Sequence, residues 1–176
     1  MMPMRFIGTL LASMLAAAGM SAALAQQPVS ALKGHDSSAP VDVSASRLEV
    51  QDRADRAIFA GNVHVKQGEL NLDTERLTVS YSGTSGIQIR RLDAAGGVTV
   101  RSPSETAKGD FGIYDLDRRL ITLIGNVRLD REANSISGAR LVIDLDSGRA
   151  VIDGGPPGVN ESGGRVTGHF TVPQKR

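Results

Sequence analysis

Apolar and polar residues alternate along most of the chain between residues 41 and 153. A period of two is typical of a β-strand with one packed face and one wet face. One short phrase, a glycine-led pair followed by such a run, recurs about every 30 residues, which indicates a repeated supersecondary unit. It reads AGNVHV at 60–65, AGGVTV at 95–100 and IGNVRL at 124–129. We therefore expect each phrase to be a turn followed by a strand.

The same alternation predicts strands throughout the chain after residue 40. They are expected at 41–45, 47–51, 57–66, 70–73, 75–81, 87–92, 98–101, 107–116, 120–129, 135–145, 149–153 and 165–172. No stretch keeps the apolar period of a helix, and every proline after residue 25 falls outside these strands, as proline should. The pattern predicts an all-β fold, built as a sandwich, a jelly roll or a barrel-like stack.

The ends of the chain read differently from its middle. Arg5 precedes an apolar run at 6–18, and Ala-Leu-Ala stands at 23–25. This is the pattern of a cleavable signal peptide at 1–25, with cleavage after Ala25, and the run is too short to span a bilayer. Residues 26–40 are rich in Ser, Ala, Gly and Pro and are expected to be a flexible lead-in. The folded domain is then expected at 41–172, with a tail at 173–176, in an exported protein.

Composition narrows the possible functions. The formal net charge is +1, and the chain has no cysteine. A disulfide framework is therefore excluded, so burial of Val, Ile and Leu must hold the fold together. Basic residues alternate with acidic ones along the strands and form no block, which disfavours nucleic-acid binding.

Residues with catalytic or metal-binding chemistry are few. There are three histidines, none of which has a second ligand at metal-binding spacing. His64 alternates with two valines, so we expect it to face solvent. The pairs Asp115 with Asp117 and Asp144 with Asp146 have the spacing of carboxylates on one strand face, which could serve glycoside hydrolysis. They stand at expected hairpin ends, where acidic residues are ordinary, and we expect no catalytic residue, metal or cofactor.

The most prominent feature is an aliphatic stripe along the expected strands. It comprises Val63, Val65, Leu77, Val79, Val98, Val100, Val127, Leu129, Leu141 and Ile143. The stripe is either a plain core or the lining of a trough between two sheets packed at a splayed angle. A trough of small aliphatic side chains suits acyl chains, because each methylene removed from water contributes about 0.8 kcal/mol. The sequence alone does not separate these two interpretations.

Several of these segments resemble the OstA-like repeats of the LptA family of lipopolysaccharide transport proteins. The resemblance rests on 58–68, on 76–79, on 123–127 and on 165–167, although Gly96-Gly97 departs from the usual Gly-Asn. It implies a slightly twisted β-jelly roll of repeated antiparallel strand pairs with a V-shaped cross-section. It also implies a non-enzymatic periplasmic carrier that binds the acyl chains of lipopolysaccharide (lipid A). Such carriers stack head to tail between an inner-membrane LptC-like anchor and an outer-membrane LptD-like translocon.

The resemblance also assigns lining residues. Val41 and Val43 are expected at the mouth of the trough, and Phe59 and Leu123 join the stripe inside it. Leu48 and Val50, in the run at 47–51, are expected to line it as well. A register shift of one residue would turn any of these side chains outward.

Three other functions remain open from the sequence. The chain could be the periplasmic domain of a related lipopolysaccharide transport component, although its leader and lack of an anchor speak against this. It could be a polysaccharide-processing enzyme on a β scaffold, for which turnover of exported glycans would be the sign. It could also be a structural surface protein, which would self-associate without affinity for lipid.

Overall fold

The structure is all-β, as the alternating pattern predicts. A computed structural model describes residues 35–83, 87–155 and 164–172. The elements within them are β1 (Val41–Ser44), β2 (Arg47–Gln51), the 3-10 helix η1 (Asp52–Ala54), β3 (Arg56–Gln67), β4 (Leu70–Ser82), β5 (Gln88–Arg101), β6 (Thr106–Asp115), β7 (Leu120–Arg131), β8 (Asn134–Asp144), β9 (Arg149–Asp153) and β10 (Thr167–His169). The expected signal peptide with its cleavage after Ala25, most of the lead-in and the tail lie outside the described residues.

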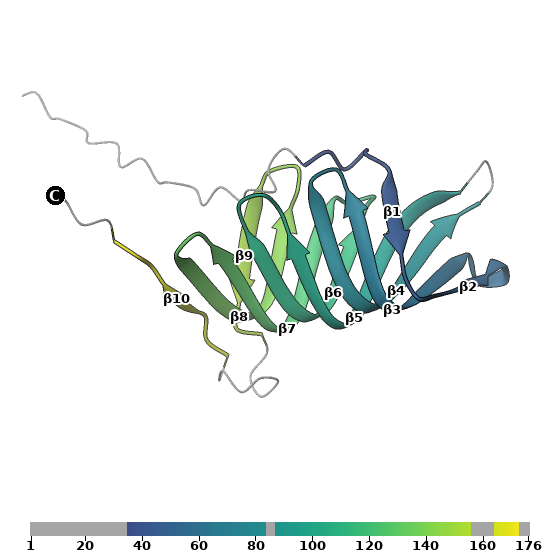
Figure 1. Cartoon of the computed structure of the whole chain (residues 1–176). Helices are drawn as coiled ribbons and strands as arrows, with labels where there is room; N and C mark the ends of the chain where they lie inside the picture. The colour runs from purple at the N-terminus through teal and green to yellow at the C-terminus, as the bar shows by residue number, and fades with distance from the viewer. Residues whose placement is uncertain (1–34, 84–86, 156–163, 173–176) are drawn as a thin grey trace, which may run out of the picture.

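The described strands form one antiparallel sheet and not the two sheets that the aliphatic stripe suggested. Strands β3 to β8 follow one another in chain order. At the first end, β1 and β2 both pair with β3, each with a different half of it. At the other end, β9 and β10 divide β8 in the same way. The sheet therefore has an open edge at each end, formed by two short strands in line (Figure 1).

The three glycine-led pairs are bends inside strands, which corrects the expectation that they are turns before strands. β3, β5 and β7 each run through their pair without interruption. Both residues of every pair have positive φ: Gly61 (80°), Asn62 (48°), Gly96 (89°), Gly97 (83°), Gly125 (80°) and Asn126 (45°). Glycine and asparagine tolerate this region better than other residues. The strands expected at 70–73 and 75–81 are likewise one strand, β4.

Each bend pair faces a single residue on the neighbouring strand. The register shifts between Thr74 and Arg76 of β4, so Glu75 alone opposes two residues of β5. Two residues against one is the definition of a β-bulge, which bends and twists a strand. The inward side chains of β4 are consequently three apart at the bend, because both Thr74 and Leu77 are buried. Simple alternation fails at this one place in the strand.

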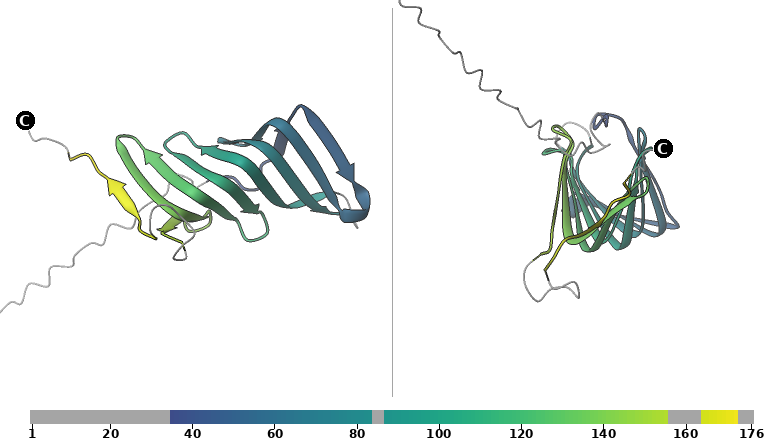
Figure 2. Two further views of the ribbon diagram at one scale, coloured as in Figure 1. Left: turned by 90° about the horizontal axis from the view of Figure 1, so that it is seen from below. Right: turned by 90° about the vertical axis from the view of Figure 1, so that its left-hand side faces the viewer.

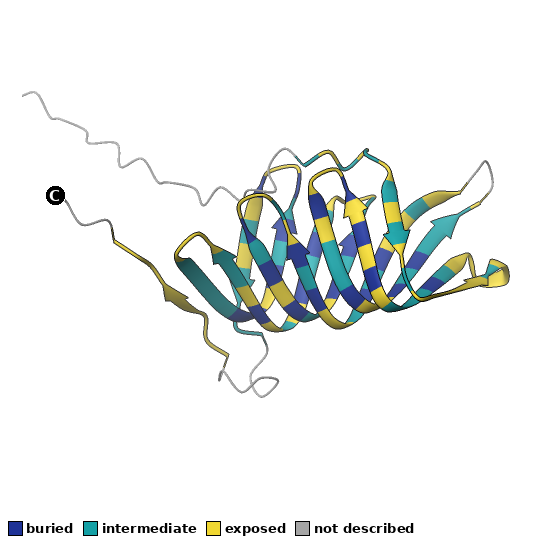
Figure 3. Ribbon diagram, viewed as in Figure 1, coloured by how far each residue is buried: buried dark blue, intermediate teal, exposed yellow. Residues whose placement is uncertain are grey.

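The bends divide the sheet into two walls that meet at an angle. Seen along the stack, the walls form a V that opens on one side (Figure 2). Along most of the long strands, buried positions recur between more exposed ones (Figure 3). The largest fully buried side chains are Leu77, Leu123, Leu141, Ile143, Val63, Val98 and Val127. The core is thus the inside of the V.

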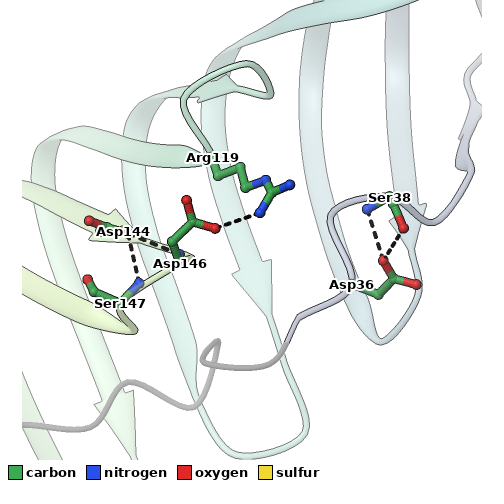
Figure 4. Close-up of polar contacts among 6 residues, drawn as sticks. All are labelled: Asp36, Ser38, Arg119, Asp144, Asp146 and Ser147. Carbon is green, nitrogen blue, oxygen red and sulfur yellow. Dashed lines mark hydrogen bonds and ion pairs between the residues drawn. The ribbon is translucent and has the colours of Figure 1, made fainter.

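Charged side chains are common on the outside and the rim, although the outer face also carries the exposed side chains of Phe111 and Ile124. On the rim, Arg119 donates to Asp146 at 2.7 Å, while the Asp144 carboxylate accepts from the backbone N–H groups of Asp146 and Ser147 (Figure 4). Arg90 pairs with Asp117 in the same way one hairpin earlier. Exposed ion pairs of this kind contribute at most about 1 kcal/mol each to the free energy of unfolding. Most of the stability therefore comes from the buried core.

Candidate functional site

The inner face of the V is an almost continuous apolar surface that crosses every strand. Cross-strand register aligns its side chains into rows that run the length of the stack. The row beside the bend on one wall is Leu48, Phe59, Leu77, Ala94, Gly112, Leu123, Leu141 and Ile152. The next row on that wall is Val50, Ala57, Val79, Leu92, Tyr114, Ile121, Ile143 and Ala150. We call this wall the first wall.

The second wall carries matching rows. Its row beside the bend is Val63, Thr74, Val98, Gly109, Val127 and Gly138. The row beyond is Val43, Val65, Leu72, Val100, Ala107, Leu129 and Ile136. Polar residues are rare on the inner face, and the buried Thr74 hydroxyl donates to the Ala95 carbonyl at 2.9 Å.

Every residue predicted to line a trough lies on this inner face, at differing depths. Those buried are Val63, Val65, Leu77, Val79, Val98, Val100, Leu123, Val127, Leu141 and Ile143. Those packed against this core but partly exposed are Val41, Val43, Phe59 and Leu129. Leu48 and Val50, on the edge strand β2, are 54% and 55% exposed. Strand register places these positions on one face of the sheet, and their role as the lining of a lipid-binding trough stays a prediction.

Small cavities lie between the walls. Two of those lined by described residues each have a volume of about 20 Å³, which is close to the room one water molecule needs. Leu70, Leu72, Leu92 and Tyr114 line both of them. Sequence reasoning missed these four. Leu70 and Leu72 do show the signal, since they alternate with polar residues, whereas Tyr114 is hidden beside Ile113, which is also apolar.

A short segment before β1 lies against the second wall through Gln67. The Gln67 amide nitrogen donates to the carbonyls of Ser37 and Ala39, both at 3.0 Å. Its oxygen lies 3.1 Å from His35 Nε2. Gln67 itself is 3% exposed and lines one of the two cavities. Residues 35–40, assigned to the lead-in by composition, are thus held against the inner face of the V.

The Tyr114 hydroxyl is the unusual polar group of the inner face. It is buried, and among the described residues it has no hydrogen-bond partner. Burial raises the pKa of Tyr114 to about 12. The hydroxyl therefore stays protonated at neutral pH and remains able to donate a hydrogen bond.

Several of the described acidic residues, and His64, make polar contacts that support turns and pairs of strands. His64 is exposed on the outer face, where its Nδ1 lies 2.5 Å from Asp73 Oδ1. Burial works against ionisation of Asp73, but hydrogen bonds from His64 and Arg101 outweigh it and lower the pKa of the Asp73 carboxyl. Asp115 accepts the backbone N–H of Arg118 in a turn. Within the described ranges, no group of three or more His, Asp or Glu is placed to hold a metal ion.

None of the helical structure within the described residues is long and apolar enough to cross a membrane. The only helical element described there is η1, a single short 3-10 turn.

Comparisons with known proteins agree with the architecture. Residues 42–149 match the family described as "LptA/(LptD N-terminal domain) LPS transport protein". An uncharacterized protein of Rhizobium meliloti (strain 1021) is 36% identical over 142 residues, which cover 76% of each chain. The crystal structure of LptH from Pseudomonas aeruginosa superposes with a TM-score of 0.68 at 19% identity, covering 78% of this chain and 99% of that one. LptH is described as the LptA homologous periplasmic component of a lipopolysaccharide transport device.

Proposed function

Because the chain belongs to the LptA/LptD N-terminal domain family of lipopolysaccharide transport proteins, we propose that it is a periplasmic carrier that shelters the acyl chains of lipopolysaccharide inside the V. The observation that carries the proposal is the apolar inner face, whose rows run without a break from β2 to β9. The family consists of transport proteins and not of enzymes, in keeping with the absence of any expected catalytic residue.

The free energy for binding comes from the acyl chains themselves. Each methylene transferred from water to the inner face contributes about 0.8 kcal/mol. The two described cavities are much smaller than an acyl chain, so binding requires the inner side chains of the walls to move. Ladder hydrogen bonds run between neighbouring strands within each wall. Spreading the walls therefore repacks apolar side chains but leaves the ladder intact.

Head-to-tail assembly is the second part of the proposal. The inner rows begin at the exposed Leu48 and Val50 of β2 and end at Ile152 and Ala150 of β9. Both ends of the sheet are edge strands with unpaired backbone groups, which can pair with another chain. Pairing the β1–β2 edge of one copy with the β9–β10 edge of another would join their apolar rows into one longer surface. An LptC-like anchor and an LptD-like translocon are the partners proposed for the free ends.

Site-specific photo-crosslinking tests the carrier function. A crosslinking amino acid at Val43, on the inner face of β1, should label lipopolysaccharide in cells. The same amino acid at Asp42 should not, because its side chain points outward from the adjacent position on the same strand. Both positions are at least partly exposed, so both should accept the substitution.

The adjacent pair is its own control for expression and folding. Equal labelling at positions 42 and 43, or labelling at neither in protein shown to be folded by circular dichroism, would refute binding inside the V. Labelling at position 43 by another lipid would keep the trough but change its cargo.

A further inference from the structure

Tyr114 places a buried hydroxyl, without a hydrogen-bond partner among the described residues, on the apolar inner face, one row below the rim. It lies in the second row of the first wall, between Leu92 and Ile121 on the neighbouring strands. Its side chain is 5% exposed and lines both cavities. A phenylalanine would fill the same space without the hydroxyl, so the aromatic ring alone does not explain the residue.

A buried hydroxyl without a partner destabilises a protein, typically by about 1–3 kcal/mol. Gln67 is a polar residue that lines one of the same cavities. Its nitrogen donates to Ser37 and Ala39 and its oxygen faces His35, and it makes no hydrogen bond with the Tyr114 hydroxyl. The Tyr114 hydroxyl is consequently the donor on the inner face that the described residues leave without an acceptor.

We propose that the Tyr114 hydroxyl donates a hydrogen bond to a carbonyl oxygen of the bound lipid, at the ester or amide that links an acyl chain to its head group. This inference rests on the proposed carrier function and adds a polar contact to it. An acyl chain is apolar along its length and carries its first acceptor at this linkage. The inner face has the complementary arrangement, because apolar side chains line its depth and the Tyr114 hydroxyl lies one row below the rim.

This geometry gives the contact a positioning role. Apolar contacts allow an acyl chain to slide along the rows, because every methylene is alike. A hydrogen bond to the linkage fixes how deep the chain enters, so the head group stays at the mouth. Since burial raises the pKa of Tyr114 to about 12, the donor is present at any pH the cell envelope meets.

Equilibrium binding of purified lipid A to Tyr114→Phe tests the inference. The variant should bind lipid A about two- to tenfold more weakly than the natural protein, the range expected for one net hydrogen bond. Without lipid it should be at least as stable in urea, because an unpaired buried hydroxyl has been removed. Tyr81→Phe is the matched control, since Tyr81 lines neither cavity, and its affinity should not change.

Infrared spectra of lipid A labelled with 13C at its acyl carbonyls identify the acceptor. The natural protein should produce a lower-frequency carbonyl band that is absent with Tyr114→Phe. Equal affinities of the variant and the natural protein, or weaker binding with an unchanged carbonyl band, would overturn the inference while leaving the carrier intact. Failure of the natural protein itself to bind lipid A would instead refute the proposed function.

Discussion

The residues with the strictest backbone requirement are the glycine-led pairs at the bends. Their positive φ angles turn the strands of a single sheet into two walls. The pairs are not equivalent in the space around them. A Cβ atom on Gly96 would lie 2.9 Å from Glu75 Cβ, whereas one on Gly97 would meet no atom within 4 Å. Backbone strain and steric conflict can therefore be separated within a single bend.

Substitutions at Gly96 and Gly97 should differ in size. Gly97→Ala should lower the free energy of unfolding by about 1–2 kcal/mol, the cost of a left-handed backbone for a residue with a Cβ. Gly96→Ala should cost more, because the same strain is joined by the contact with Glu75. Gly97→Asn should cost less than Gly97→Ala, since Asn occupies this place in the other two bends. Urea unfolding measures all three, and equal losses at both positions would show that the steric term is absent.

The outer face offers a pH-dependent contribution at Asp73. Its pKa is lower in the folded protein than the ordinary carboxyl value, so its ionised form stabilises the fold above that ordinary value. This stabilisation is lost as pH falls through the lowered pKa. Asp73→Asn should reduce the loss of stability between pH 7 and pH 3 by less than about 1 kcal/mol, given the exposure of the pair.

Urea unfolding at both pH values measures this effect. Asp42→Asn is the control, an outward aspartate of β1 with no ion pair among the described residues. If Asp73→Asn and the natural protein lose the same free energy of unfolding between pH 7 and pH 3, the ionised Asp73 carboxylate does not stabilise the fold.

At the scale of elements, hairpins repeat but the ends of the sheet do not. β3 with β4, β5 with β6 and β7 with β8 are long pairs that each contribute to both walls. The edges are made of short strands in line, and the segment at 35–40 is held by one buried glutamine. Because these contacts are few, this segment should open more easily than the hairpins.

Replacing the glutamine should release that segment alone. In Gln67→Leu, backbone amides at 35–40 should exchange with deuterium faster, while exchange in β4 to β8 stays slow. Hydrogen-exchange mass spectrometry measures this, with Gln88→Leu, an exposed glutamine at the start of β5, as control. Unchanged exchange at 35–40 would mean that other contacts hold the segment.

Most elements could be predicted from the sequence, because alternation and turn residues are local signals. The bends could not. Gly61-Asn62 reads as a turn in any short window, and only the register with Glu75 on the next strand shows that the same strand bends there and continues. Val63 and Leu77 were predictable as inner residues from their neighbours. Tyr114 was not, because Ile113 beside it is equally apolar, and the pairing of residues across strands decides which of the two faces inward.

At the scale of the whole molecule, the two ends of the V are unlike each other. At one end, the inner side chains of β2 are exposed. At the other end, the inner side chains of β9 are half-buried. Contact between unlike ends is heterologous and can continue beyond a dimer. Self-association of this protein is therefore expected to rise steadily with concentration and not to stop at two copies.

A charge at the β2 end should interrupt this association. Leu48→Asp should shift sedimentation velocity profiles toward the monomer at concentrations where the natural protein associates, without loss of folding, because Leu48 is exposed. Arg47→Asp puts an aspartate on the outer face of the same strand. It changes the charge by two units and removes the ion pair with Glu49, and it should still have the smaller effect. Equal behaviour of the two variants would argue against joined inner rows.

The bends also make the molecule extensible. Each long strand crosses the bend and contributes to both walls. One more hairpin could therefore be added without changing the hairpins already present. Neighbouring strands are about 4.8 Å apart, so a duplicated hairpin would lengthen the apolar inner face by about 10 Å while keeping its cross-section. Duplication of a hairpin within the gene can therefore increase the length of the molecule in fixed steps. The length of a single copy is set by the number of hairpins it contains.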